Sequence, residues 1–195
     1  MKTRIAMNNA LFGLGFSTLV FATSMPASAQ VPVPDAQRAS RATIYEAALA
    51  NTSNPNLSQL VSLLSTAFGD DLEDIFDGEA KYTVFGPTNA AFGSLLASLT
   101  SAEQAALLDT QNGLLAKILL YHVAPGDWYR DSFPIGALPM ANGDLASVYW
   151  NGEVVEIEGA TIGKETVLKN GIFHAIDAVI VPPGFLDELQ QAAGG

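Results

Sequence analysis

The stretch YTVFGPTNAAF at residues 82–92 combines a strand, a strand end and a helix start. Residues 82–85 favour strands, and Pro87 ends the strand because it has no N–H to donate to a neighbouring strand. The Thr88 hydroxyl can accept a hydrogen bond from the first turn of the helix that follows. The stretch therefore predicts a strand that passes directly into a helix.

The second decisive stretch is NGIFHAIDAVIVPP at residues 170–183. From residue 172 to residue 181, apolar side chains occupy both alternating faces, which predicts a central strand buried on both sides. His174 and Asp177 would point to opposite faces, because side chains alternate along a strand. A direct catalytic pair of these two residues is therefore not expected.

Residues before the first stretch are predicted to be helical. Thr43 and Glu46 have the spacing of a capping box, in which a hydroxyl and a carboxylate satisfy the free N–H groups of a helix start. Apolar residues recur at helical spacing over residues 57–68, which predicts a helix packed on the core. After the first stretch, a second capping box is expected at residues 101–104, from Ser101 to Gln104.

The chain changes character after Pro125. Asn-Gly pairs at residues 142, 151 and 170 favour the positive φ angles of tight hairpin turns. The strands expected around these turns are residues 148–150, 153–157, 161–167 and 172–181. Helices first and strands second predict an α+β domain, with N-terminal helices packed on a C-terminal antiparallel β-sheet.

Residues 1–29 have the three parts of a cleavable secretory signal peptide. Lys2 and Arg4 supply the charged start, an apolar stretch follows, and the triplet Ala27-Ser28-Ala29 gives a cleavage site after Ala29. The apolar stretch is shorter than the ~20 residues of a membrane-spanning helix, so a retained anchor is the less favoured alternative. Residues 30–42 are predicted to be a flexible leader.

The composition narrows the classes of function. The chain has 9 Lys and Arg against 20 Asp and Glu, and this acidic balance repels phosphate backbones, so no nucleic-acid partner is expected. The chain has no cysteine, which excludes disulfides, thiol nucleophiles and thiolate metal sites. No second apolar run is long enough to span a membrane. We therefore expect no membrane anchor, and secretion into the periplasm or the extracellular space.

The two stretches resemble the two signature motifs of fasciclin domains, TVFAPTNxAF and NGxxHxIDxVLxP. LYHVAPG at residues 120–126 is similar to the Tyr-His segment between those motifs in the family. The resemblance implies a single fasciclin-like domain over residues 43–185 and a C-terminal tail over residues 186–195. The short signal and the lack of cysteine favour a bacterial source. The residues that carry the resemblance, all expected to be structural, are Phe85, Pro87, Thr88, Phe92, Tyr121, His122, His174 and Asp177.

The resemblance also implies adhesion, because fasciclin domains are extracellular interaction modules and some bind integrins. Tyr121 and His122 match the Tyr-His segment proposed as an integrin determinant in the family. An Asp-Ile pair proposed as a second determinant is replaced here by Glu165-Thr166, and the chain has no Arg-Gly-Asp. Integrin binding is therefore not carried over beyond Tyr121 and His122, whose apolar flanks favour burial.

Two histidines, His122 and His174, are the candidates for metal ligands or catalytic bases. We expect instead two buried imidazoles held by hydrogen bonds, because a buried polar group needs a partner. The chain has no Gly-x-Ser-x-Gly turn for a serine nucleophile, and the adjacent acids at residues 70–74 are typical of a solvated helix face. The sequence predicts no enzyme and no cofactor. A weak calcium site at Asp70 to Asp77 is left open, although the segment lacks the spacing of an EF-hand loop.

One candidate contact patch follows the Pro-Gly turn at residue 125. It consists of Trp128, Tyr129 and Arg130, and aromatic residues with arginine are enriched at binding hot spots. The alternative is that the two aromatic residues anchor this loop to the core.

These observations predict a secreted fasciclin-domain protein that mediates cell adhesion or a matrix or surface interaction, without catalysis. Its partner would be an extracellular or cell-surface protein or polysaccharide. The alternative is a periplasmic carrier that holds a small ligand or lipid in a cleft between helices and sheet, for which an apolar pocket of several hundred Å³ would be evidence.

Overall fold

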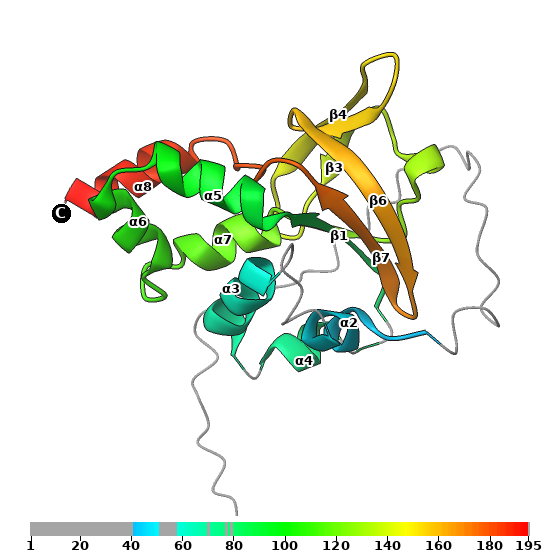
Figure 1. The fold of residues 1–195 in the computed structure, drawn as a ribbon, viewed down its shortest axis with the longest axis horizontal. Coiled ribbons are helices and arrows are strands. Elements are labelled where there is room, and N and C mark those ends of the chain that lie inside the picture. The colour runs from blue at the N-terminus through cyan, green and yellow to red at the C-terminus, as the bar shows by residue number, and fades with distance from the viewer. Residues whose placement is uncertain (1–40, 51–57, 70, 77, 79, 195) are drawn as a thin grey trace, which may run out of the picture.

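The structure is a computed structural model that describes residues 41–50, 58–69, 71–76, 78 and 80–194. Within these residues, a group of helices forms one end of the molecule and the β4 side of a twisted sheet forms the other (Figure 1). The predicted signal peptide, its cleavage after Ala29 and nearly all of the predicted leader lie outside the described residues.

Helices dominate the first half of the described chain, where β1 interrupts them, and strands dominate the second half before the final helix. The helices are α2 (Ile44–Ala50), α3 (Ser58–Phe68), α4 (Asp71–Phe76), α5 (Asn89–Ser98), α6 (Ser101–Leu108), α7 (Leu114–Leu120), the 3-10 helix η1 (Arg130–Ser132) and α8 (Phe185–Gly194). The strands are β1 (Tyr82–Pro87), β2 (Val123–Pro125), β3 (Gly136–Pro139), β4 (Leu145–Trp150), β5 (Val155–Ile157), β6 (Ala160–Leu168) and β7 (Gly171–Ile176).

The strands form one sheet in the order β2-β1-β7-β6-β5-β4-β3. β1 and β7 pair in parallel, from Tyr82 opposite Gly171 to Pro87 opposite Ile176, and the other neighbours pair antiparallel. The predicted α+β class is confirmed, but the prediction of an antiparallel sheet is wrong at its centre. The chain between β1 and β7 is long enough for the crossover that parallel pairing requires, and it contains both helices and strands.

The junction between β1 and α5 forms as the sequence predicts. β1 ends at Pro87, and the next residue, Thr88, is the N-cap of α5. Its hydroxyl accepts the Ala91 N–H at 3.2 Å. The predicted capping box of Thr43 and Glu46 also forms, with both of its hydrogen bonds, just before α2.

The capping box of α6 lies one residue before its predicted position. The N-cap is Thr100, which pairs with Glu103, whereas the sequence pattern predicted Ser101 with Gln104. Both pairs fit the pattern of a hydroxyl followed three residues later by Glu or Gln. The extended backbone at Thr100, with φ −67° and ψ 162°, makes this residue the last one before the helix.

Two of the three Asn-Gly pairs lie in hairpin turns with positive φ. Gly143 has φ 93° and Gly152 has φ 102°, as the sequence predicts. Gly171 is required for a different reason, because it packs directly on β1. A Cβ added to Gly171 would lie 2.0 Å from the Tyr82 carbonyl oxygen.

Asn170, which precedes this glycine, is a buried connector. Its Oδ1 accepts the Ile44 N–H at 2.8 Å, and its Nδ2 donates to the carbonyl oxygens of Phe76 at 2.6 Å and Gly78 at 3.2 Å. One side chain therefore holds α2 and the end of α4 against the start of β7.

β7 ends at Ile176, earlier than the sequence predicts. Residues 177–181 leave the sheet, and the Ile180 N–H donates to the His122 ring instead of to a strand neighbour. The predicted burial of both strand faces up to residue 181 is therefore wrong in its extent, and within β7 the face with Phe173 and Ala175 is only half-buried.

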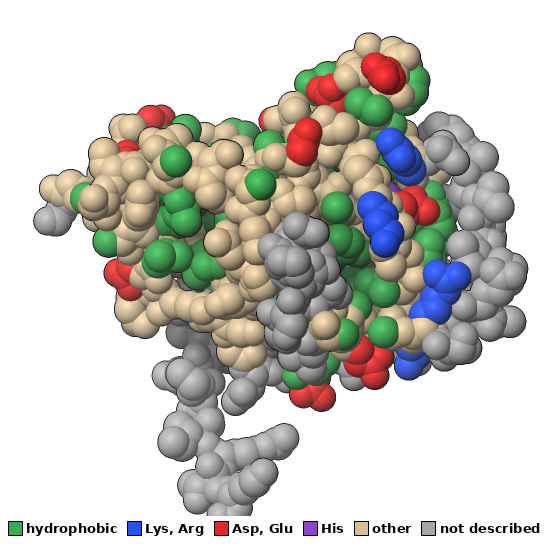
Figure 2. Space-filling view, viewed as in Figure 1, with side chains coloured by type: hydrophobic (Ala, Val, Ile, Leu, Met, Phe, Trp, Pro, Cys, Tyr) green, Lys and Arg blue, Asp and Glu red, His purple; other side chains and the backbone are tan. Residues whose placement is uncertain are grey.

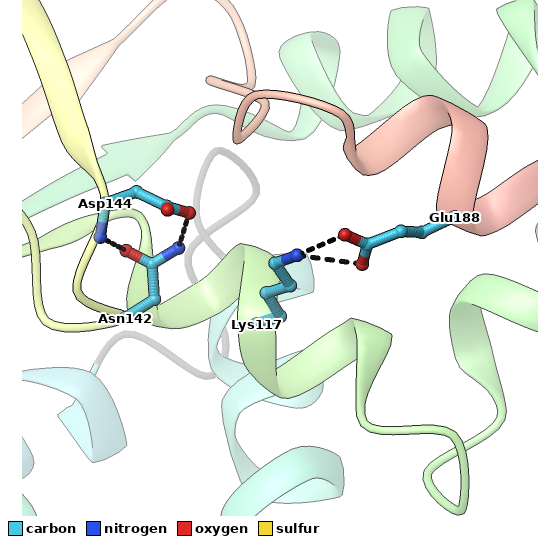
Figure 3. Close-up of polar contacts among 4 residues, drawn as sticks. All are labelled: Lys117, Asn142, Asp144 and Glu188. Carbon is cyan, nitrogen blue, oxygen red and sulfur yellow. Dashed lines mark hydrogen bonds and ion pairs between the residues drawn. The ribbon is translucent and has the colours of Figure 1, made fainter.

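The segment predicted as a C-terminal tail is helix α8 over its described part. Phe185 and Leu189 are buried beside α6 and α7. Lys117 of α7 forms an ion pair with Glu188 of α8 at 2.6 Å (Figure 3). The folded region thus extends through residues 186–194.

The buried apolar side chains form two cores. The helix-side core consists of Ile44, Leu60, Leu64, Phe76, Val84, Phe92, Ala106, Leu107, Leu114, Leu115, Ile118, Leu119, Val123, Leu168, Phe185 and Leu189. The sheet-side core consists of Phe85, Tyr121, Ala124, Phe133, Leu138, Met140, Ala146, Val148, Val155, Ile157, Ala160, Ile162, Ile176 and Ile180. Val84 and Phe85 are adjacent in β1 and belong to different cores, so the central strand separates the two.

Candidate functional site

The Tyr-His segment lies where α7 ends and the chain turns toward β2. Tyr121 is the C-cap of α7, and Tyr121 and His122 are 0% and 2% exposed. The Tyr121 hydroxyl donates to the Leu145 carbonyl oxygen at 3.2 Å. Burial, and after it the nearby Glu158 carboxylate, raises the pKa of Tyr121. Neither side chain is available to a partner at the surface.

His122 connects α7 to the segment that follows β7. Its Nδ1 lies 2.8 Å from the Ile118 carbonyl oxygen, and its Nε2 accepts the Ile180 N–H at 3.1 Å. These partners assign the hydrogen to Nδ1, because a carbonyl can only accept and a backbone N–H can only donate. Burial lowers the pKa of His122 to about 4, so the ring is neutral at pH 7. Both nitrogens are engaged, and no lone pair is left for a metal ion or a proton transfer.

His174 lies in β7 and faces the sheet-side core. Its Nε2 lies 2.8 Å from the Trp128 carbonyl oxygen and therefore carries the hydrogen, whereas Nδ1 has no partner among the described residues. The ring packs between Phe85 and Phe133, with centroid distances of 5.9 Å and 5.1 Å. Burial lowers the pKa of His174, against a smaller opposing effect of the Trp128 carbonyl. His174 is a neutral ring in an aromatic cluster.

Asp177 does not lie in the environment of His174. It is exposed just after β7, and its Oδ1 accepts the Thr161 N–H at 2.7 Å. The acid opposite His174 on β6 is Glu165, whose carboxylate accepts the Arg130 N–H at 2.8 Å. Asp177 and Glu165 thus each accept a hydrogen bond from a backbone N–H, and neither forms a hydrogen bond with His174.

The signature residues of the first stretch are positioned as scaffold. Phe85 is fully buried in the sheet-side core, and Phe92 is buried in the helix-side core. Pro87 and Thr88 make the turn between β1 and α5. The structure brings Phe85 together with His174 and places the other three residues around the start of α5.

Trp128 anchors its loop, as the alternative interpretation proposed. Its backbone N–H donates to the Thr83 hydroxyl and its Nε1–H donates to the Pro125 carbonyl oxygen, both at 2.8 Å. The half-buried ring packs against the sheet-side core. Tyr129 is also half-buried, and Arg130 is exposed. The indole therefore belongs to the support of the loop and not to an open contact patch.

The structure reveals an exposed apolar patch that the sequence analysis missed. Among the described residues, four of the six large apolar side chains that are most exposed lie on or beside the β3–β4 ribbon. They are Ile135 at 65%, Leu145 at 57%, Tyr149 at 41% and Trp150 at 55% exposed, and we call them the ribbon patch. Burial alternates along β4, with Ala146 and Val148 buried, and this period of two was the signal in the sequence.

The segment that carries the ribbon patch is rich in acidic residues. Residues 131–163, which contain β3, β4 and β5, include five Asp and Glu and no Lys or Arg. Figure 2 shows acidic side chains on the projecting part of the molecule that carries β4. The turn between β3 and β4 is fixed by Asn142, whose Nδ2 donates to Asp144 at 2.7 Å (Figure 3). The ribbon patch therefore lies in an acidic part of the chain.

A cavity of about 490 Å³ lies between helices α2 and α3 and the strands β6 and β7. Its walls are mainly apolar, and among the described lining residues Lys164 is the one with a charge. A second apolar cavity, of about 190 Å³, lies among α3, α5, α6 and α7 and reaches the His122 ring. The larger cavity is the cleft between helices and sheet that the carrier alternative requires.

The described residues contain no group of three or more His, Cys, Asp or Glu side chains that could hold a metal ion. Asp70 and Asp77, which bound the possible calcium segment, lie outside the described residues, so that expectation is untested. No helix in the described part of the chain is long and apolar enough to cross a membrane.

Comparison with known proteins adds the following likenesses. A family model for the Fasciclin domain matches residues 55–182. Protein sll1483 of Synechocystis sp. is 34% identical over 188 residues, which cover 94% of this chain and 99% of that protein. Cell surface glycolipoprotein MPB83 of Mycobacterium bovis is 32% identical over 138 residues, which cover 70% of this chain and 60% of that protein.

A solved structure, a FAS1 domain pair from the insect cell adhesion molecule Fasciclin I, superposes with a TM-score of 0.56 at 16% identity. The match covers 74% of this chain and 52% of that chain. At this identity the likeness shows the fold, which is the fasciclin fold.

Proposed function

The chain belongs to the fasciclin domain family, and from this premise we propose that it is an exported, non-catalytic protein that binds a cell or matrix surface. The proposed site of contact is the ribbon patch. The proposed location, periplasmic or extracellular, follows from the predicted signal peptide with cleavage near Ala29.

The observation that carries this proposal is the concentration of exposed apolar side chains on the ribbon. Large apolar groups that are exposed singly are ordinary, but four of the six most exposed ones in the described part of the chain lie on or beside one two-stranded ribbon. Leu145 and Tyr149 lie on one face of β4 and Trp150 lies on the other, because side chains alternate along a strand. Tyr149 and Trp150 are 41% and 55% exposed, and both are residue types enriched at binding hot spots. β3 is also an edge strand of the sheet, with one side unpaired by another described strand.

The Tyr-His segment makes no contribution to the proposed contact. Tyr121 and His122 are buried, and the polar atoms of both side chains bond to backbone groups of the same chain. Contact through these residues would require the end of α7 to open. We therefore propose surface binding through the ribbon and not integrin binding through Tyr121 and His122.

The named relatives support a role outside the cytoplasm. MPB83 is called a cell surface glycolipoprotein, and Fasciclin I is called an insect cell adhesion molecule. The acidic residues of the segment that carries the ribbon patch favour a partner whose surface is neutral or basic. An extracellular protein meets this description, and a neutral polysaccharide that stacks on Trp150 is the second possibility.

The test is a binding measurement on cell-surface and matrix fractions with the double variant Tyr149→Ala/Trp150→Ala. We expect retention of the purified protein on at least one fraction to fall by about tenfold or more, because two hot-spot side chains are removed. Leu186→Ala is the matched control, since Leu186 is 47% exposed but lies on α8. Equal retention of the double variant and the unmodified protein would refute the ribbon as the contact site.

A further inference from the structure

The larger cavity has walls from two separate layers of the fold. One wall is made by α2 and α3 with Ala47, Leu60 and Leu64, and the other is made by the sheet with Phe173 and Ala175. Its volume of about 490 Å³ lies within the roughly 300–1,000 Å³ of pockets that hold small molecules. The cavity is therefore large enough for a ligand and not only for water.

Small residues leave the space between the two layers unfilled. Ala47 and Ala48 of α2 face the cavity, and Ala175 of β7 lies on the opposite wall. The Phe173 ring lies against Gly86, where an added Cβ would be 2.2 Å from the ring. The Phe173 ring can therefore lie close to the backbone of β1 and does not fill the cavity. A larger residue at position 86 would push the ring into the cavity.

A positive charge lies at the border of this apolar space. Lys164 lines the cavity and is exposed, and no ion-pair partner for it lies among the described residues. Two more cations lie toward the far end of β6, where Arg41 donates to the Val167 carbonyl oxygen and Lys81 donates to that of Lys169. Figure 2 shows Lys and Arg side chains gathered beside hydrophobic ones on this side of the molecule.

This grouping is notable because the chain as a whole has a formal net charge of −11. Few cations are present, and one of them, Lys164, lines the large apolar cavity of the described residues. An apolar cavity with a cation at its border is complementary to a molecule with an apolar chain and an anionic end.

We propose that this cavity binds a long-chain carboxylate, a fatty acid, with the acyl chain between α3 and the sheet and the carboxylate at Lys164. The hydroxyls of Thr88 and Thr166, which also line the cavity, are further donors for the carboxylate oxygens. The site is distinct from the ribbon patch, so the proposal does not depend on the proposed surface contact.

The experiment is calorimetric titration of the purified protein with dodecanoate and with dodecanol, each below the concentration at which it aggregates. We expect saturable 1:1 binding of both, with dodecanoate bound about fivefold more tightly because of the exposed charge pair. Shortening the acid to decanoate should weaken binding roughly tenfold, the effect of two fewer buried methylene groups. Absence of saturable dodecanoate binding would overturn the proposal.

Two substitutions at the cavity separate the charge from the apolar walls. Lys164→Glu lies on the exposed border, so it leaves the fold intact; it should reverse the preference between dodecanoate and dodecylammonium. Ala175→Leu fills the cavity and should weaken every ligand by about tenfold or more. The thermal unfolding of each variant checks that it is folded.

Lys117→Ala is the matched control, because Lys117 pairs with Glu188 between α7 and α8 and lies outside the cavity. It should bind dodecanoate as the unmodified protein does. Lys164→Ala removes the same single positive charge, so if Lys164→Ala and Lys117→Ala weaken dodecanoate binding equally, binding follows the total charge and the assigned site is wrong. The Tyr149→Ala/Trp150→Ala variant should bind dodecanoate normally, so a failure of either proposal is distinguishable from a failure of the other.

Discussion

His122 and His174 are both buried and both lie in signature segments, but the structure holds their rings in different ways. His122 bonds through both nitrogens to the backbone of two separate segments, Ile118 in α7 and Ile180 after β7. His174 bonds through Nε2 alone and otherwise packs between two phenylalanine rings. The first ring joins segments, whereas the second mainly fills space. A histidine in a signature motif therefore does not have one structural role.

The strongest test of this difference is His122→Ala. The substitution removes a buried ring and leaves the Ile118 carbonyl and the Ile180 N–H without their partners, each in the protein interior. We expect the free energy of unfolding to fall by about 3–4 kcal/mol, as is typical when a buried hydrogen-bonded group is lost. Urea denaturation followed by circular dichroism measures the change. A loss below about 1 kcal/mol would show that His122 is not a connector.

Acid should destabilise the protein through the same ring. The pKa of His122 is about 4 in the folded protein and ordinary, about 6.5, in the unfolded chain, so unfolding takes up a proton between these values. The stabilisation is complete above about pH 6.5 and is lost as the pH falls toward 4, by about 3 kcal/mol at pH 4. His174, with its lowered pKa, adds to the loss in the same direction.

The control for acid is the variant His122→Gln, which has no ring to protonate. The carboxylates are the same in the variant and in the unmodified protein. The difference between the two profiles of unfolding free energy against pH therefore measures the effect of His122. Parallel profiles between pH 7 and pH 4 would contradict the role of burial in holding the ring neutral.

His174→Phe should have a much smaller effect than loss of His122. The new ring would occupy the space between Phe85 and Phe133, the unpartnered Nδ1 would be removed, and only the hydrogen bond to Trp128 would be lost. We expect a change of about 1 kcal/mol or less in the free energy of unfolding. The same denaturation experiment compares it with His122→Phe. Equal losses at the two positions would remove the distinction between them.

Tyr121→Phe tests the residue beside His122 and should have the smallest effect. It keeps the buried ring and removes only the hydroxyl that donates to Leu145 at 3.2 Å. A loss of about 0.5 kcal/mol in the free energy of unfolding is expected, because one long, neutral hydrogen bond disappears. The midpoint of thermal unfolding measures the change. A loss of stability as large as that of His122→Ala would mean that the Tyr121 hydroxyl contributes as much as His122 to the packing at the end of α7.

Local chemistry made part of the structure predictable. The change from β1 to α5 follows from Pro87 and Thr88 alone, so it was predicted correctly. The position of the α6 cap was not predicted correctly. Thr100-Glu103 and Ser101-Gln104 both fit the pattern of a capping box, and the backbone conformation decides between them. Hydrogen-bonding patterns within a few residues thus identify helix starts to about one position.

Long-range partners were not predictable from the sequence. Nothing near Tyr82 or Gly171 indicates that β1 and β7 run parallel, since this depends on how the intervening chain packs. The early end of β7 depends on His122, which is far away in sequence. The ribbon patch was missed for the same reason, because the exposure of Tyr149 and Trp150 depends on which side of the sheet the other strands and helices cover.

The parallel pairing of β1 with β7 also sets the order in which a growing or translocating chain can fold. Tyr82 meets its neighbour Gly171 only after nearly the whole domain has been made, so the middle of the sheet is closed by a contact between distant parts of the chain. Until then β1 has only β2 beside it, and Asn170 cannot yet hold α2. A nascent chain therefore cannot complete the centre of its sheet until its last strand has been made.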